Sequence, residues 1–201
     1  FMDFITFAIP FFLLALLAEF AYGVLVNKNT YRLNDVISNL FMGTLRTTNK
    51  LIFIGFAGYV FYLIETKFSL WRMDSSSLVT WIFAFFMYDF CYYWFHRISH
   101  ERQIFWASHV AHHQSEDYNL STALRQTGTG AFLSWIFYIP IFLMGVPSYV
   151  FISVGSLNLI YQFWVHSEHI PKLGRYENYF VTASNHRVHH AQNEQYLNKN
   201  Y

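Results

Sequence analysis

The ten histidines of this 201-residue chain fall into four short groups, and no histidine lies outside them. The groups are His96 with His100; His109, His112 and His113; His166 with His169; and His186, His189 and His190. Residues three and four apart share one face of a helix, so each group directs two or three imidazoles toward one place. A single histidine is usually a packing residue, but this grouping is typical of metal ligands. The chain must therefore fold so that distant segments bring the groups together.

The composition predicts a membrane protein. Hydrophobic residues make up 54% of the chain, aromatic residues 22% and charged residues only 12%, about half the charged share of an ordinary soluble domain. A net charge of +1 provides no basic face for nucleic acid. The single cysteine, Cys91, rules out an internal disulfide. Because the sequence starts and stops inside recognisable patterns, we expect it to be a fragment.

The apolar segments set the expected topology. Residues 4–26, 42–64 and 78–95 are each predicted to span the bilayer. The apolar segment 131–165 is broken at Gly145-Val146-Pro147, and its first arm reaches only ~21 Å, which is short for a crossing. We therefore predict a helical hairpin that returns the last two histidine groups to the side of the first two. Residues 1–201 are expected to form a single domain, an all-α integral membrane bundle.

The basic residues predict the orientation of this bundle. Only Lys67 and Arg72 lie on the side away from the histidines. The other 11 of the 13 lie on the histidine side: Lys28, Arg32, Arg46, Lys50, Arg97, Arg102, Arg125, Lys172, Arg175, Arg187 and Lys199. By the positive-inside rule, the histidine site of this multi-pass protein is expected on the cytoplasmic side.

The number of histidines predicts two metal ions. A zinc ion takes four ligands, or three and a water molecule, so eight or more clustered histidines exceed what one ion needs. Asp89 lies seven residues before His96, on the same helix face and inside an apolar run, where an ionisable group is costly. We predict that Asp89 accepts a hydrogen bond from a ligand imidazole. The alternative is that Asp89 pairs with an arginine near the membrane surface.

The histidine groups and their neighbours resemble a known superfamily. Asp89, Tyr93, Trp94, His96, Arg97 and His100, followed by His109-x-x-His112-His113 and His186-x-x-His189-His190, resemble the fatty acid hydroxylase and sterol desaturase superfamily of membrane di-iron enzymes. The resemblance covers roughly residues 80 to 201. Glu101, the run from Ser115 to Gln126 and the ending Asn198-Lys199-Asn200-Tyr201 are similar to the alkylglycerol monooxygenase branch.

This resemblance implies an activity and a ligand set. The branch oxidises the carbon next to the ether oxygen of alkylglycerol lipids, with dioxygen as co-substrate and tetrahydrobiopterin as reductant. The resemblance implies two iron ions, whereas the histidine count alone implies only two metals that accept imidazole. His169 is outside the family pattern, and Asn185 stands where the branch has a histidine. The implied metal ligands are His96, His100, His109, His112, His113, His166, His186, His189 and His190.

Polar residues near the histidine groups, most of them between the second group and the hairpin, are candidates for supporting roles. Glu101, Asp117 and Asn185 are expected to support the ligand histidines. Glu116, Asn119, Arg125 and Gln126 are expected to hold a lipid head group or a pterin. The alternative for the segment from Glu116 to Gln126 is a solvated connection rich in helix caps.

The leading hypothesis is a membrane-bound di-iron oxygenase that acts on a lipid and draws electrons from a pterin or a redox protein. An unactivated C–H bond offers nothing to a general acid or base, so a redox metal and dioxygen are needed. A sterol or fatty acyl desaturase or hydroxylase with the same site is the nearest alternative. A metal transporter or sensor is the alternative from another class, but only Glu19 and Asp89 lie deep in the spans. A zinc hydrolase is excluded because Ile104 stands where its second histidine would be.

Overall fold

The computed structural model describes residues 4–197, and helices are the only regular secondary structure within them. The helices are α1 (Phe4–Leu25), α2 (Leu33–Leu63), η1 (Ile64–Phe68), α3 (Leu78–Glu101), α4 (Gln103–His113), η2 (Leu120–Leu124), α5 (Gly130–Leu143), α6 (Ser148–Trp164), η3 (Gly174–Asn178), α7 (Ala183–His189) and η4 (Glu194–Tyr196). The predicted all-α fold class is confirmed. The ending from Asn198 to Tyr201, which carries part of the resemblance, lies outside the described residues.

Three helices are long and apolar enough to cross a membrane: Phe4–Leu25, Leu33–Phe68 and Leu78–Glu101. Their outward faces carry large apolar side chains, among them Phe7, Phe11, Leu14 and Ile52, which a bilayer would cover. The protein is therefore a membrane protein. By contrast, α5 has only 14 residues, about 21 Å of helix, and is too short to cross alone.

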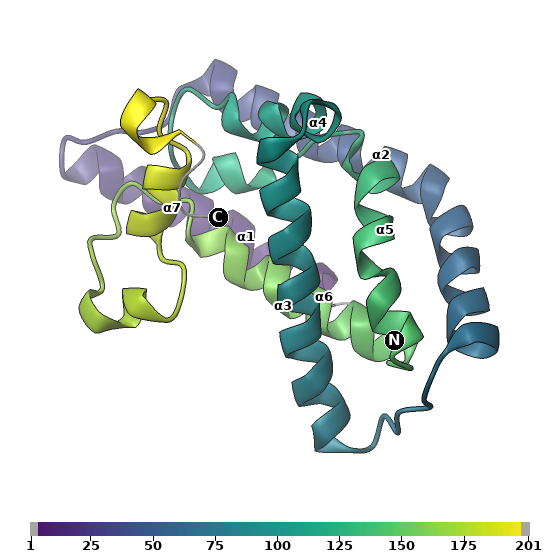
Figure 1. Cartoon of the computed structure of the whole chain (residues 1–201). Coiled ribbons are helices and arrows are strands. Elements are labelled where there is room, and N and C mark those ends of the chain that lie inside the picture. Colours follow the sequence, from purple (N-terminus) through teal and green to yellow (C-terminus); the bar gives the residue numbers. More distant parts are fainter. Residues whose placement is uncertain (1–3, 198–201) are drawn as a thin grey trace.

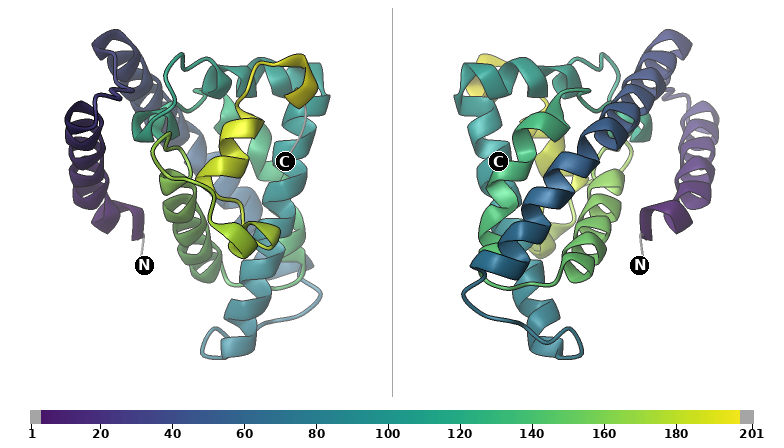
Figure 2. Two further views of the ribbon diagram at one scale, coloured as in Figure 1. Left: turned by 90° about the vertical axis from the view of Figure 1, so that its left-hand side faces the viewer. Right: turned by 90° about the vertical axis from the view of Figure 1, so that its right-hand side faces the viewer.

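Figure 1 shows α3 at the centre of the bundle, with α4 at one end and the loop of residues 69–77 at the other. Helix α3 packs against α4, α5 and α6, while α2 packs against α5 and α1 against α6. In Figure 2, α1 lies at one edge of the bundle. The core around α3 consists of Ala84, Tyr88, Cys91, Tyr138, Ile141, Val146, Val150 and Val154. This core holds the lower part of α3 fixed, so the histidines at its upper end project from a rigid support.

The sequence places the end of the third apolar segment at residue 95, but α3 continues through Glu101. His96 and His100 are therefore one helical turn apart on α3 itself rather than in a following loop. Helix α4 begins two residues later, after the extended residue Arg102 (φ −123°, ψ 125°). This single break redirects the chain, so that the second histidine group returns toward the first.

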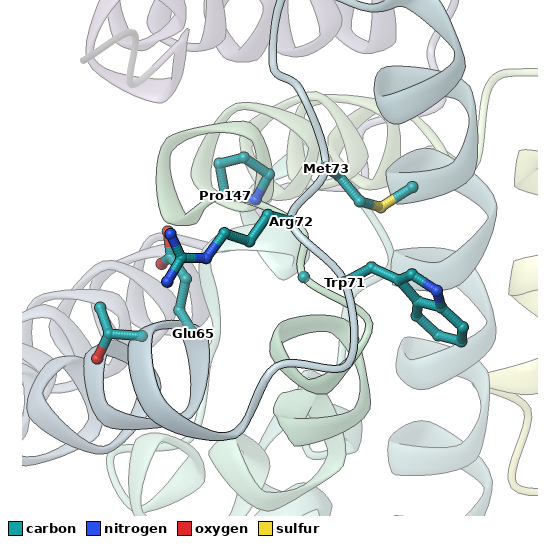
Figure 3. A pocket seen from close by; sticks show the side chains of 7 residues that line it. Glu65, Trp71, Arg72, Met73 and Pro147 are labelled. Atoms are coloured by element: carbon teal, nitrogen blue, oxygen red, sulfur yellow. The ribbon is translucent and has the colours of Figure 1, made fainter.

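The turn between α5 and α6 meets the loop of residues 69–77 at the end of the molecule away from the histidines. The amide of Leu70 donates to the carbonyl of Leu143 at 2.8 Å, and that of Met73 donates to Gly145 at 3.1 Å. A cavity of about 290 Å³ lies here, and Figure 3 shows the Trp71 and Arg72 side chains pointing to opposite sides of the loop. These contacts fix the hairpin turn against the loop.

Gly145 is required at this turn for two reasons. Its φ is +84°, and a Cβ atom at this position would lie 1.9 Å from the carbonyl oxygen of Trp71. We expect Gly145→Ala to lower the free energy of unfolding by about 2 kcal/mol or more, measured as a lower thermal midpoint in detergent. Gly174→Ala is the matched control, because Gly174 also has a positive φ (+64°) but no atom within 4 Å. Equal losses from the two variants would contradict the close-contact explanation.

Candidate metal centre

Nine of the ten histidines gather in two clusters at the upper end of α3. The first cluster contains His96, His100, His109, His113 and His189, and the second contains His112, His166, His186 and His190. Within each cluster, one nitrogen atom from every histidine lies within 4.8 Å of all the others. Among the described residues, both clusters consist of histidine alone. His169 lies outside both.

Helical spacing explains how each group is divided. His109 and His113 of α4 are four residues apart and enter the first cluster, while His112 between them enters the second. The last group does the reverse, since His186 and His190 enter the second cluster and His189 of α7 enters the first. The two clusters are adjacent, because the rings of His113 and His190 stack with centroids 4.2 Å apart. Two short segments thus supply imidazoles to both clusters at once.

In the second cluster the Nε2 atoms converge. The Nε2 atom of His166 lies 3.3 Å from that of His112 and 2.9 Å from that of His186, which lies 3.1 Å from that of His190. Ligand atoms about 2.1 Å from a shared metal ion are roughly 3.0 to 3.4 Å apart. The Nε2 spacing of this cluster therefore fits one ion bound between the four rings.

Backbone carbonyls orient two of these rings. Nδ1 of His112 donates to the carbonyl oxygen of Arg125, and Nδ1 of His166 donates to that of Gln162, both at 2.8 Å. Since a carbonyl can only accept, the proton is assigned to Nδ1, and Nε2 carries the lone pair. A hydrogen bond from the second ring nitrogen is what metal-binding imidazoles typically have. Both residues thus present Nε2 as a donor to a metal.

Burial keeps the histidines neutral. It lowers the pKa of His112 to about 4 and holds the pKa values of His109, His113, His166, His186 and His190 well below their usual range. The neighbouring imidazoles act in the same direction, because a second positive charge in the cluster is unfavourable. At neutral pH the rings therefore have the unprotonated nitrogen that a metal requires.

Arg125 and the residues around it connect the second histidine group to α2. The Arg125 side chain donates from Nε to the carbonyl of Ala111 at 2.7 Å and from Nη1 to Oδ1 of Asn39 at 3.2 Å. The buried Asn39 also donates to the hydroxyl of Ser121 at 2.9 Å. These contacts fix the carbonyl of Arg125 that receives the His112 proton. Sequence reasoning missed Asn39, since nothing in its neighbourhood distinguishes it.

The other predicted supporting residues lie around the clusters without contacting their imidazoles. Glu116 and Asp117 pair with Arg32 at 2.8 and 2.9 Å, and Glu101 pairs with Arg97 at 2.8 Å. Asn119 caps η2 and donates to the carbonyl of Thr30, and Gln126 donates to the carbonyl of Ala123. Asn185 accepts from the hydroxyl of Thr182, and Asp89 is exposed on α3. Their roles toward metal, lipid or pterin stay predictions.

Glu19 is a supporting residue that sequence reasoning noted only for its depth in the first span. Its carboxylate is buried and accepts from the hydroxyl of Tyr31, from the amide of Leu120 at 2.8 Å and from the hydroxyl of Ser167 at 2.5 Å. Leu120 begins η2 after the second histidine group, and Ser167 directly follows His166. Glu19 therefore ties α1 to two segments that position cluster histidines.

Glu19→Leu should both destabilise the protein and reduce its metal content. The substitution leaves the Leu120 amide and the Ser167 hydroxyl buried without their acceptor, at about 1 to 3 kcal/mol each. We expect a lower thermal midpoint in detergent and less metal retained after dialysis. Glu19→Gln, which keeps one acceptor oxygen, should lose less on both measurements. If the leucine and glutamine variants behaved alike, the hydrogen-bonding role would be wrong.

Fold and site together define a histidine-box membrane protein, in which apolar helices support two adjacent clusters of imidazoles. The sequence matches the fatty acid hydroxylase family over residues 81–201, and the chain belongs to this family. No solved structure matches it.

Three curated relatives carry the name alkylglycerol monooxygenase. The chain is 42% identical to the human protein over 99% of its own length, 41% identical to that of Danio rerio over 96%, and 38% identical to that of Xenopus tropicalis over 99%. It spans 45%, 44% and 44% of these relatives, slightly less than half of their length. The predicted resemblance to the superfamily and to this branch is thus confirmed.

Proposed function

We propose that this chain is the metal-binding membrane part of a di-iron, dioxygen-dependent monooxygenase that cleaves the ether bond of alkylglycerol lipids. The observation that carries the proposal is the pair of all-histidine clusters in a protein 42% identical to human alkylglycerol monooxygenase. Two iron ions in these clusters would supply the redox chemistry that an unactivated C–H bond requires. The proposed ligands are the nine cluster histidines.

The chain's own residues would bind the metal ions, orient the ligand rings and exclude water. The neutral imidazoles of His112 and His166 would offer the lone pair on Nε2 to a metal ion. The carbonyls of Arg125 and Gln162 hold these two rings in place. The half-buried ring of Tyr92 stacks on His96 with centroids 5.8 Å apart, and its hydroxyl donates to Gln162. Aromatic side chains on the membrane side of the clusters would admit an alkyl chain and keep water away.

The overall reaction inserts one oxygen atom of O2 into the C–H bond next to the ether oxygen and reduces the other to water with two electrons and two protons. The resulting hemiacetal separates into a fatty aldehyde and glycerol. Tetrahydrobiopterin is the proposed two-electron donor, by analogy with the branch. The cytoplasmic side is proposed for the site because of the asymmetry of basic residues.

The test is turnover of 1-O-hexadecylglycerol by the purified protein in detergent, with and without tetrahydrobiopterin, following aldehyde by mass spectrometry and oxygen with an electrode. We expect one aldehyde per O2 and no aldehyde without the pterin. A hydroxylated or desaturated sterol or acyl lipid in place of aldehyde would favour the desaturase alternative. Bound metal without oxygen consumption on any lipid would overturn the oxygenase function and reopen the transporter alternative.

A further inference from the structure

Arg46 of α2 is a positive charge directed into the bundle. Gly43, three residues earlier on the same face of α2, lies against η2, since a Cβ atom there would be 2.6 Å from the carbonyl oxygen of Leu124. Asn39, four residues before Gly43 on this face, forms hydrogen bonds with Ser121 and Arg125. Because Arg46 shares this face, its half-buried side chain is directed toward the interior of the bundle.

Side chains of three other helices lie within electrostatic range of the Arg46 guanidinium. It interacts electrostatically with the phenol groups of Tyr88 and Tyr92 of α3 and Tyr138 of α5, and with the imidazole of His112 of α4. The rings of Tyr88 and Tyr138 stack with centroids 5.0 Å apart. The guanidinium thus lies within electrostatic range of His112 of the second cluster, among groups that can donate hydrogen bonds but carry no negative charge at neutral pH.

Arg46 has no counter-charge within residues 4–197. The ion pairs of this part of the chain involve Lys28, Arg32, Arg97 and Arg187, and no hydrogen bond or carboxylate reaches Arg46. Both histidine clusters likewise lack a carboxylate among the described residues. An arginine cannot lose its proton to relieve this cost, and an uncompensated charge inside a membrane protein is expensive and usually functional.

We propose that Arg46, with Tyr88 and Tyr138, binds the anionic head group of an amphiphile, a phosphate or a carboxylate, beside the second histidine cluster. The planar guanidinium matches the two oxygens of either anion. An amphiphile is favoured over a free anion because Arg46 lies on a helix of membrane-spanning length whose outer face carries large apolar side chains. The interpretation of this amphiphile as a substrate or its analogue rests on the proposed function.

The proposal is tested by equilibrium binding in uncharged detergent with three probes: hexadecyl phosphate, 1-O-hexadecylglycerol, which has the same tail and a neutral head, and inorganic phosphate. We expect the protein to bind hexadecyl phosphate at least about tenfold more tightly than the glycerol ether. Arg46→Met should remove this preference, and Arg46→Lys should keep part of it. Lys50→Met is the matched control, since it removes an exposed positive charge four residues further along α2 and should leave the preference unchanged.

Thermal stability provides a readout that a purely structural arginine would not give. Because the charge lacks a counter-ion, Arg46→Met should melt at the same or a higher temperature than the parent protein without ligand. Hexadecyl phosphate should raise the melting temperature of the parent but not of Arg46→Met. A strongly destabilised Arg46→Met, together with a parent protein whose melting temperature hexadecyl phosphate does not raise, would overturn the proposal.

The binding experiment with the three probes separates the proposal from its alternatives. Equal affinity of the parent for hexadecyl phosphate and the glycerol ether would overturn the proposal, as would loss of the preference in Lys50→Met. If inorganic phosphate competed as strongly as hexadecyl phosphate, Arg46 would still be an anion site, but for a free anion. Since binding needs no turnover, a charge preference in an inactive protein would leave this inference standing while the proposed function failed.

Discussion

Replacing His112 by alanine is expected to lower the iron content from about two ions per chain to about one and to reduce lipid turnover by at least about a hundredfold. His112 supplies one of the four Nε2 atoms of the second cluster, 3.3 Å from that of His166, and the carbonyl of Arg125 orients it. Its loss leaves three imidazoles in that cluster and all five of the first. Iron per chain is measured by mass spectrometry after expression in iron-supplemented medium and anaerobic purification.

His169→Ala is the matched control for this experiment. His169 lies outside both clusters and packs with its ring centroid 5.2 Å from that of Tyr22, so its removal should leave the iron content unchanged. Retention of two irons by the His112 variant, or an equal loss in the His169 variant, would contradict the assignment of the second cluster. A single zinc ion in the parent protein, unaffected by either variant, would contradict the di-iron centre itself.

Acid is expected to destabilise the metal-free protein between pH 6.5 and about 4. Burial lowers the pKa of His112 from 6.5 to about 4, so in this range the unfolded chain binds a proton that the folded chain excludes. Stability therefore rises with pH through this window and is lost as the pH falls. His112 alone contributes roughly 3 kcal/mol at neutral pH, and the other cluster histidines with lowered pKa values add in the same direction.

This pH dependence is checked by thermal unfolding in detergent at a series of pH values that covers the window, from about 7.5 to about 4. The midpoint should fall steeply below pH 6.5, and His112→Gln, which cannot titrate, should show a shallower fall. A midpoint independent of pH across this window would mean that the histidines are solvated rather than buried in the metal-free state.

The sequence predicts the membrane bundle and the presence of a histidine centre because both depend on local spacing. It does not predict which groups meet in each cluster, since that depends on how α3, α4 and α7 pack together. The sequence also does not predict the contacts of Arg125 with Ala111 and of Glu19 with Ser167. Such contacts join segments that are far apart in sequence and carry no periodic signal.

Asp89 shows the limit of reasoning from helical faces. Seven residues place Asp89 and His96 on the same face of α3, as the sequence indicates, but also separate them by about 10 Å along the helix axis. At this separation the directions of the two side chains decide whether the carboxylate reaches the ring, and the role of Asp89 toward a ligand imidazole stays a prediction. Agreement in face is therefore necessary for a hydrogen bond between two side chains of one helix, but it is not sufficient.

The backbone acceptors of His112 and His166 have a genetic consequence. A carboxylate that orients a ligand histidine is lost by one substitution, whereas the carbonyls of Arg125 and Gln162 remain whatever side chain these positions carry. Both rings thus keep an acceptor after a point mutation at residue 125 or 162, although the Arg125 side chain also helps to hold its own carbonyl in place. Their orientation is vulnerable instead to insertions, deletions or proline substitutions that shift the local backbone, and random mutagenesis should find inactivating changes of that kind near residues 125 and 162.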